Sequence, residues 1–174
     1  MVDVTGGAGS EDDGFDEAFP ALYRRARSVA HRILGSMPDA EDAAAEAMAR
    51  ALLDWGRVGR LPYREAWVQR VAANVAIDVV RRRRAPAARA ETGTGTEGSD
   101  DAAVLRLALV AALAELPTRQ REAVILRHLV GCPEAEVAAA LGVSTNTAKK
   151  HLQRGLGRLR RMVDLEGGLD VAFE

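Results

Sequence analysis

The sequence predicts an all-α fold: two small helical domains joined by a flexible linker, the second domain being a helix-turn-helix. The first observation is composition: 48% of the 174 residues are hydrophobic but only 4% are aromatic, and Ala is abundant, which favours helices over strands. The second is that apolar residues recur at helical spacing, without alternating runs long enough for a strand. The third is a Gly- and Thr-rich stretch, 91–100, with too few apolar residues to fold.

A first helix is expected from about residue 16 to residue 34, where Gly35 and Pro38 end it. Asp39 is expected to cap a second helix that runs to about Trp55. The expected inward positions of these two helices are Leu22, Ala26, Val29 and Ile33, then Ala44, Met48, Leu52 and Trp55.

A loop containing Gly and Pro, residues 56–62, precedes a third helix expected over 63–84, before Pro86. Its inward positions are expected to be Trp67, Val71, Val75 and Val79 or Val80. Four consecutive Arg residues, 81–84, close this helix. Compensation of the helix dipole explains some basic charge there, but four Arg exceed that need, so we expect phosphate contacts.

Two further helices are expected after the linker, over 101–116 and 118–130, separated by Pro117. Their expected inward positions are Val104, Leu107 or Ala108, Ala111 or Leu113, then Ala123, Val124, Leu126 and Leu129 or Val130.

The helix-turn-helix is expected from Glu134 onward: a short helix to Ala140, a turn over 141–144, and a second helix opening at Thr145. Gly142 supplies the backbone freedom of the turn, and Ser144 is a good N-cap. Ala148, Leu152, Leu156 and Leu159 fall on one side of the second helix, and Asn146, Lys149, Lys150, Gln153 and Arg154 on the other. A basic face that is merely solvated is the plain alternative for an isolated helix, but the turn, cap and preceding helix favour entry into a major groove.

The net charge of −1 conceals a segregation of charge along the chain. Residues 21–90 hold fourteen Arg against seven acidic side chains, and residues 102–163 hold ten basic side chains against four acidic ones. Two basic blocks between acidic segments predict two contacts with a polyanion. The expected divisions are a disordered acidic tail (1–14), a first domain (15–88), a linker (89–101), a second domain (102–163) and an acidic tail (164–174).

Composition and motifs argue against an enzyme, a metal site or a membrane protein. The one cysteine, Cys132, allows no disulfide within the chain, and the three His residues are scattered without metal-ligand spacing. No catalytic residue, metal or cofactor is therefore expected. The N-terminus lacks a secretion signal and no apolar run reaches ~18 residues, so we expect no membrane span and a cytoplasmic protein.

Three segments of the second half, Leu116–Arg127, Glu134–Ser144 and Thr147–Leu152, resemble the C-terminal domain of bacterial extracytoplasmic-function (ECF) sigma factors, in the sigma-70 superfamily. In the first half, Pro38–Asp42 resembles the start of that family's polymerase-binding helix, and Trp67–Asp78 with the following Arg run resembles its promoter-melting helix.

This resemblance implies a sigma factor that binds RNA polymerase core through the beta-prime clamp and the beta flap and directs transcription initiation at promoter DNA. It implies polymerase contacts from Asp39, Glu41, Asp42 and Glu46. It places capture of the unpaired −10 element at Arg70, Asn74, Asp78, Arg81, Arg82, Arg83 and Arg84. It places reading of the −35 major groove at Thr145, Asn146, Thr147, Lys149, Lys150, His151, Gln153 and Arg154. An anti-sigma factor that clamps both domains is a further candidate partner.

Several alternatives stay open. Trp67 is expected in the core rather than as a stacking platform, and Asn74 with Asp78 fits an internal polar bridge as well as DNA contact. The recognition helix also resembles that of LuxR-type regulators, so a stand-alone regulator is the main competing function. The family usually has Gln at the position of Ala45, so an interaction protein that has lost promoter recognition is a third possible function. The family commonly has Arg at the position of His151, so the promoter sequence is expected to differ.

Overall fold

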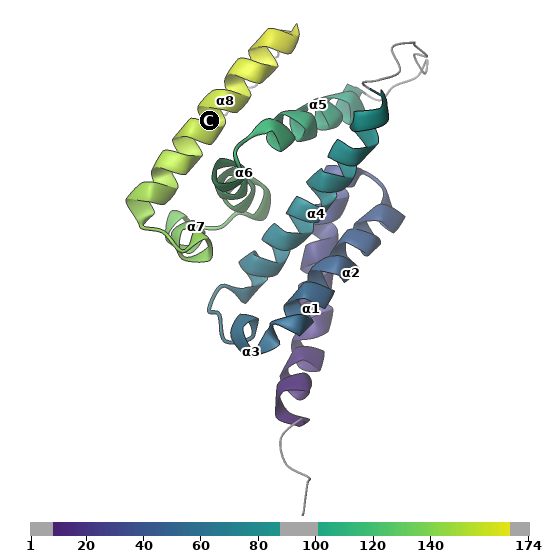
Figure 1. Cartoon of the computed structure of the whole chain (residues 1–174), viewed down its shortest axis with the longest axis vertical. Helices are drawn as coiled ribbons and strands as arrows, with labels where there is room; N and C mark the ends of the chain where they lie inside the picture. Colours follow the sequence, from purple (N-terminus) through teal and green to yellow (C-terminus); the bar gives the residue numbers. More distant parts are fainter. Residues whose placement is uncertain (1–8, 88–100, 168–174) are drawn as a thin grey trace, which may run out of the picture.

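The computed structural model describes residues 9–87 and 101–167, and within these ranges every regular element is helical. The first group of helices contains α1 (Gly9–Leu34), α2 (Met37–Leu53), α3 (Trp55–Val58) and α4 (Arg64–Ala87). The second group contains α5 (Asp101–Glu115), α6 (Thr118–Val124), the π-helical turn η1 (Ile125–Val130), α7 (Glu134–Leu141) and α8 (Thr145–Gly167) (Figure 1). The predicted all-α fold class is confirmed.

Residues 88–100, which hold nearly all of the predicted linker, lie outside the described residues. Residues 1–8 and 168–174, which hold much of the two predicted tails, do as well.

The turn between α1 and α2 differs from the sequence prediction at its cap. Gly35 has a φ of 70°, a left-handed conformation that suits Gly and ends α1. Ser36, not Asp39, is the N-cap: its Oγ accepts from the backbone N–H of Asp39 at 3.5 Å. Asp39 therefore lies within the first turn, because Pro38 fits a first helical turn and lets the helix begin before it.

Two other predicted boundaries are wrong. The predicted loop 56–62 begins with the short helix α3, whose Val58 is fully buried. The helix α4 continues through Pro86 to Ala87 rather than ending at Arg84. The fixed φ of Pro86 is helical, although proline cannot donate a hydrogen bond to the carbonyl four residues back.

One hydrophobic cluster lies entirely within the first group and includes Phe15, Leu22, Met48, Val58 and Val68. The rings of Phe15 and Trp55 meet edge to face with centroids 5.1 Å apart. The inward positions predicted for α1 are all buried, as are Ala44 and Met48, but Leu52 is 46% exposed. The preceding residue, Ala51, is fully buried instead, so the covered face of α2 at this end includes Ala51 and not Leu52.

The core face of α4 is shifted by about one residue from the prediction. Trp67, Val71, Val75 and Val79 are only half-buried, whereas the deepest positions are Val68, Ala72, Ala73, Ala76, Ile77 and Val80. The reason is that α4 packs on two sides: α1 and α2 contact one flank, and α5, η1 and α7 contact the other. A helix covered from two directions buries a broad face rather than one stripe.

In the second group, α6 lies in the middle and is contacted by η1, α7 and α8. The inward positions Ala123, Val124 and Leu126 are confirmed, although the helix is interrupted by η1 instead of running unbroken to Val130. The prediction for α5 is wrong at its start: Val104 and Leu107 are 52% and 49% exposed. The buried residues of that helix, Val110, Ala112 and Leu113, lie toward its C-terminal end.

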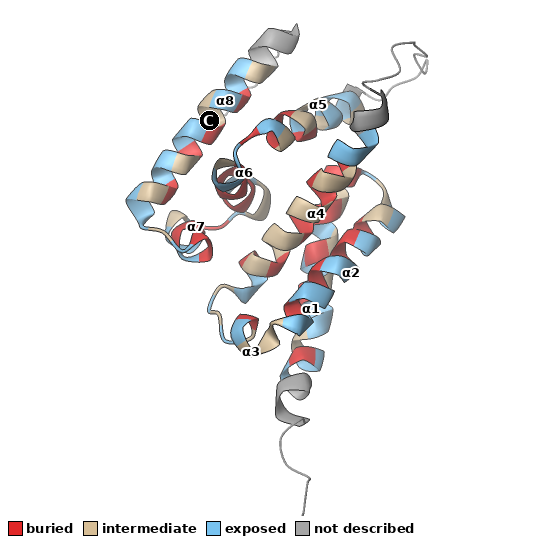
Figure 2. Ribbon diagram, in the orientation of Figure 1, coloured by how far each residue is buried: buried red, intermediate tan, exposed pale blue. Residues whose placement is uncertain are grey.

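The two groups share a second hydrophobic cluster. It joins Ile33 of α1 and Ile77 and Val80 of α4 to Leu113 of α5 and Leu126 of η1. Figure 2 shows the buried positions gathered along α4 and α6 and on the facing parts of their neighbours. The structure is therefore a closed arrangement, with α4 between α1 and α2 of its own group and the helices of the second group.

Candidate nucleic-acid interface

The second helix of the helix-turn-helix begins where the sequence predicts. Gly142 has a φ of 65° and ends α7. Ser144 caps α8, since its Oγ accepts from the backbone N–H of Thr147 at 3.2 Å. The α8 helix thus starts at Thr145, in a turn whose geometry is fixed by these two residues.

The two faces of α8 are as expected. Ala148, Leu152 and Leu159 are buried, and Leu156 is half-buried. The exposed side chains of the opposite face are Thr145, Asn146, Lys149, Lys150, Gln153 and Arg154. Ammonium, guanidinium and amide groups on one exposed helix face are suited to phosphates and to base edges.

Three of the predicted DNA-reading side chains are less available. The hydroxyl of Thr147 lies 2.9 Å from the Oγ of Ser144. His151 is half-buried, and its Nδ1 is buried without a hydrogen-bond partner. Lys149 forms an exposed ion pair of 3.3 Å with Glu134 of α7. Of the two lysines, Lys150 is therefore the one that faces solvent without a recorded acidic partner in the described part of the chain.

The Arg side chains at the end of α4 make different contacts. Arg81 and Arg82 are exposed; Arg81 lies 3.5 Å from the carboxylate of Asp78, and Arg82 donates to the Asp78 carbonyl at 3.3 Å. Arg83 reaches across to α2 and donates to both carboxylate oxygens of Asp39, at 2.7 and 2.8 Å. The side chain of Arg84 lies outside the described residues.

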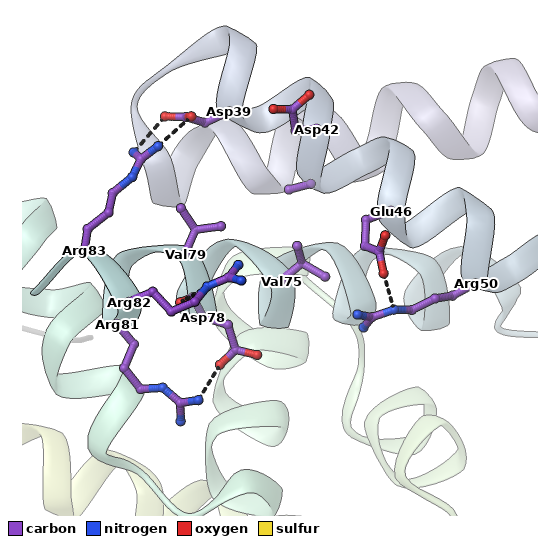
Figure 3. A pocket seen from close by; sticks show the side chains of 11 residues that line it. Asp39, Asp42, Glu46, Arg50, Val75, Asp78, Val79, Arg81, Arg82 and Arg83 are labelled. Atoms are coloured by element: carbon purple, nitrogen blue, oxygen red, sulfur yellow. Dashed lines mark hydrogen bonds and ion pairs between the residues drawn. The ribbon is translucent and has the colours of Figure 1, made fainter. Parts of the chain in front are cut away.

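Three of the four acidic residues predicted to contact polymerase line one groove with this Arg run. The groove lies between α2 and α4, has a volume of about 660 Å³, and is lined by Asp39, Asp42 and Glu46 opposite Asp78 and Arg81 to Arg83 (Figure 3). Glu46 pairs with Arg50 at 2.9 Å within α2. Glu41 lies away from the groove and pairs with Arg27 of α1 at 3.2 Å. Asp42 is exposed on the α2 surface.

Two residues predicted to capture the −10 element are half-buried rather than exposed. Arg70 donates to the backbone carbonyl of Ala140 in α7 at 3.1 Å and lies 3.7 Å from the carboxylate of Glu122 in α6. Asn74 donates to the same carboxylate at 3.4 Å. Burial lowers the pKa of the Arg70 guanidinium, while the charge of Glu122 acts in the opposite direction. Arg70 and Asn74 are thus directed into the second group of helices.

Asn74 and Asp78 contact other residues and do not form the internal bridge considered for them. Asn74 bonds to α6, and Asp78 pairs with Arg81. Trp67, expected in the core, is only half-buried at the edge of the first cluster, and the guanidinium carbon of Arg57 lies 5.8 Å from its ring centroid.

Sequence reasoning missed two polar residues at this contact, Arg121 and Glu122, which are only 9% and 8% exposed. Arg121 donates to the Asn74 side-chain oxygen at 3.3 Å. Their partners lie 47 and 48 residues away, so no local pattern could have identified them.

Within the described ranges, no cluster of three or more His, Cys, Asp or Glu side chains is arranged to hold a metal ion. A search of the same residues finds no helix with the length and hydropathy of a membrane span.

Comparison with known proteins matches two families. Residues 19–85 match the family described as Sigma-70 region 2, and residues 106–159 match that described as Sigma-70, region 4. The first match covers α2 and most of α1 and α4, and the second covers the helix-turn-helix, so each candidate interface lies within a matched segment.

Whole-chain relatives agree with these matches. The chain is 34% identical to the RNA polymerase sigma-E factor of Streptomyces coelicolor over 146 residues, covering 80% of this chain and 78% of that protein. It is 29% identical to the ECF RNA polymerase sigma factor SigM of Mycobacterium tuberculosis over 159 residues, covering 90% and 81%. Among solved structures, CnrH in complex with the cytosolic domain of CnrY aligns with a TM-score of 0.52 at 26% identity, covering 93% of this chain and 92% of that one.

Proposed function

Because this chain belongs to the extracytoplasmic-function group of the sigma-70 family, we propose that it binds RNA polymerase core and directs promoter recognition and transcription initiation. It acts as a non-enzymatic subunit, in the cytoplasm, where the polymerase works. The observation that carries this function is the presence of both family segments in one chain, in the order region 2 and then region 4.

The second group of helices supplies the −35 reader. Asn146, Gln153 and Arg154, with the two lysines, lie on the exposed face of α8, where they reach the base edges and phosphates of a major groove. Ala148 and Leu152 fix the opposite face to α6 and α7, which orients the reading face.

The first group supplies the −10 and polymerase contacts. Arg81 and Arg82 form an exposed basic end of α4 that suits the backbone of an unpaired strand, and Arg70 and Asn74 would add contacts to its bases. Glu41, Asp42 and Glu46 on α2 face the polymerase clamp. Asp39, Glu41 and Glu46 contribute less than Asp42, because each of the three is already paired with an Arg of this chain.

A stand-alone LuxR-like regulator is not favoured, since such a protein has no need of the region 2 segment over residues 19–85. An anti-sigma factor is proposed as an additional partner that covers the two basic helical groups. The −35 and −10 contacts are made by different groups, so such a partner would act by holding both.

In vitro transcription with core polymerase on a library of random promoters tests the proposed function. The purified chain is expected to start transcripts from a discrete subset of templates, and to give a specific gel shift only together with core. Tight specific binding of duplex DNA by the free chain, without transcripts in the presence of core, would instead support the stand-alone regulator.

A further inference from the structure

The exposed basic face of α8 continues past the residues assigned to reading of the −35 element. Arg158, Arg160 and Arg161 follow Arg154 on this helix, and all three side chains are exposed. Residues three or four apart lie on one side of a helix, so Arg158 and Arg161 extend the row that Lys150 and Arg154 begin. The proposed function gives these three arginines no task.

Neither ion pairing nor the helix dipole accounts for Arg158, Arg160 and Arg161. Within the part of the chain that the structure describes, none of the three makes a hydrogen bond or an ion pair, whereas exposed Arg50 of α2 pairs with Glu46 at 2.9 Å. Basic side chains in the last turn of a helix are stabilised by its dipole, but the last turn of α8 contains no basic residue. Like charges three or four positions apart also repel one another. The charge of these arginines is therefore available to an anion outside the chain.

Gly157 lies in the middle of the same basic face, three residues after Arg154 and four before Arg161. Glycine inside a helix is destabilising relative to Ala, and packing within the chain does not require it here, because a Cβ at Gly157 would meet nothing within 4 Å. At Gly155, by contrast, a Cβ would lie 2.8 Å from Cγ2 of Val124. Glycine without a packing reason suits a place where the helix backbone closely approaches a ligand.

The geometry of a helix-turn-helix on duplex DNA brings this part of α8 to the DNA backbone. The N-terminal residues of the second helix contact base edges in the major groove. The segment from Thr145 to Arg154 is about 14 Å long, which is close to the groove width of about 12 Å. The residues that follow Arg154 therefore cross the sugar-phosphate backbone at the border of the groove.

We propose that Gly157, Arg158, Arg160 and Arg161, which we call the Gly157 surface, bind the sugar-phosphate backbone that borders the −35 major groove. This inference deepens the proposed function and rests on it, since the reading face of α8 sets where the surface meets the duplex. Phosphate contacts fix the register and orientation of a reader and carry no sequence information. Continuity with the reading face on one helix favours duplex DNA over an acidic segment of another protein.

The first test measures the salt dependence of duplex binding by the full chain. Fluorescence anisotropy with a labelled duplex of random sequence is recorded at a series of salt concentrations. The double variant Arg158→Gln and Arg161→Gln loses two phosphate contacts, so its slope of log affinity against log salt concentration should fall by about 1.8. The matched control, Arg24→Gln and Arg25→Gln, removes the same charge from exposed positions of α1 and should keep the wild-type slope. An unchanged slope in the first variant, or an equal decrease in both, would overturn the Gly157 surface.

The second test uses Gly157→Ala, in which stability and DNA binding should change in opposite directions. The added methyl group removes the helix penalty of glycine, so the fold should become more stable in urea unfolding. The same methyl group holds the DNA backbone away from the helix, so the affinity for the duplex should fall. A purely structural role of Gly157 would not weaken binding by a more stable protein. Binding as tight as that of wild type would overturn the close approach at Gly157.

Run-off transcription with core polymerase separates this inference from the proposed function. If the wild-type chain starts transcripts but the arginine variant keeps the wild-type slope, the Gly157 surface is wrong and the sigma-factor function stands. An acidic protein segment as the true ligand would give that result. If the slope falls as expected but no template yields transcripts, the surface binds duplex phosphates, and both the proposed function and the place of the surface beside a −35 element are overturned.

Discussion

Arg83 of α4 and Asp39 of α2 form a two-pronged ion pair: Nη1 and Nη2 of the guanidinium lie 2.8 and 2.7 Å from Oδ2 and Oδ1 of the carboxylate. The sequence assigned these residues to two different partners, DNA and polymerase. Their pairing joins the start of α2 to the end of α4 across one side of the groove in Figure 3. Arg81 and Arg82, by contrast, contact Asp78 of α4 itself.

The Asp39–Arg83 pair predicts an acid-dependent contribution to stability. The Arg83 guanidinium, and next the Ser36 side chain, hold the pKa of the Asp39 carboxyl below its ordinary value of 3.8. A carboxyl with a lowered folded-state pKa stabilises the fold above the ordinary pKa and loses that effect as pH falls through the lowered one. Asp39→Asn should therefore lower the melting temperature at neutral pH; the difference from wild type should shrink below pH 3.8 and vanish once the pH has fallen through the lowered pKa.

Asp42→Asn is the matched control for that measurement, because it removes the same charge from α2 without touching Arg83. If the difference in melting temperature between wild type and Asp39→Asn did not change with pH, the ionisation of Asp39 would not contribute to stability.

The different contacts of Arg81, Arg82 and Arg83 predict unequal roles in promoter melting. Replacing both Arg81 and Arg82 with Ala should reduce open-complex formation about tenfold, if each loses a phosphate contact of about 0.7 kcal/mol. Core binding should change much less. Permanganate footprinting and a core pull-down measure the two effects. Arg83→Gln should reduce promoter melting less than replacing Arg81 alone or Arg82 alone, since Arg83 is already paired with Asp39. A larger effect would mean that the Asp39–Arg83 pair opens when DNA binds.

How far the sequence predicts this structure depends on whether the determining contacts are local. The start of α8 was predictable from Gly142 and Ser144, because a left-handed Gly and a side-chain cap act within four residues. The stripe of α1 was predictable because that helix buries a single face.

Tertiary packing decided the remainder. The face of α4 was displaced because the second group covers its other flank, and Val104 was expected inside although α5 is covered mainly at its C-terminal end. The closure of Arg70 and Asn74 on α6 depends on residues about fifty positions away. An amphipathic pattern contains no information on such pairing.

Close approach of α8 to α6 at Gly155 predicts opposite effects for two glycines of the same helix. A Cβ at Gly155 would lie 2.8 Å from Cγ2 of Val124 and 3.2 Å from the Gln120 carbonyl oxygen, whereas one at Gly157 meets nothing within 4 Å. Gly155→Ala should therefore destabilise the fold by about 1–3 kcal/mol, and Gly157→Ala should stabilise it by up to about 1 kcal/mol. Urea unfolding measures both. Equal effects would mean that α6 shifts freely to accommodate the methyl group.

The cap of α8 predicts a linked loss of stability and DNA binding. Ser144→Ala removes the acceptor of the Thr147 backbone N–H and should cost about 1 kcal/mol. Because the cap holds the first turn, where Thr145 and Asn146 face solvent, −35 duplex binding with core should weaken as well. Ser144→Asp, which retains an acceptor and suits the helix dipole, should restore stability. Failure of that substitution to rescue would argue against the cap.

The lysines of α8 predict the salt dependence of −35 binding. Each lysine that contacts a phosphate contributes about one unit to the slope of log affinity against log salt concentration, so Lys150→Ala should reduce the slope by about 1. Lys149→Ala should have a smaller effect, since Lys149 is already paired with Glu134 at 3.3 Å. Glu134→Gln releases that lysine and should tighten duplex binding. Fluorescence anisotropy of the chain with core, at a series of salt concentrations, measures all three. A slope unchanged in the double variant Lys149→Ala and Lys150→Ala would remove this face of α8 from the groove.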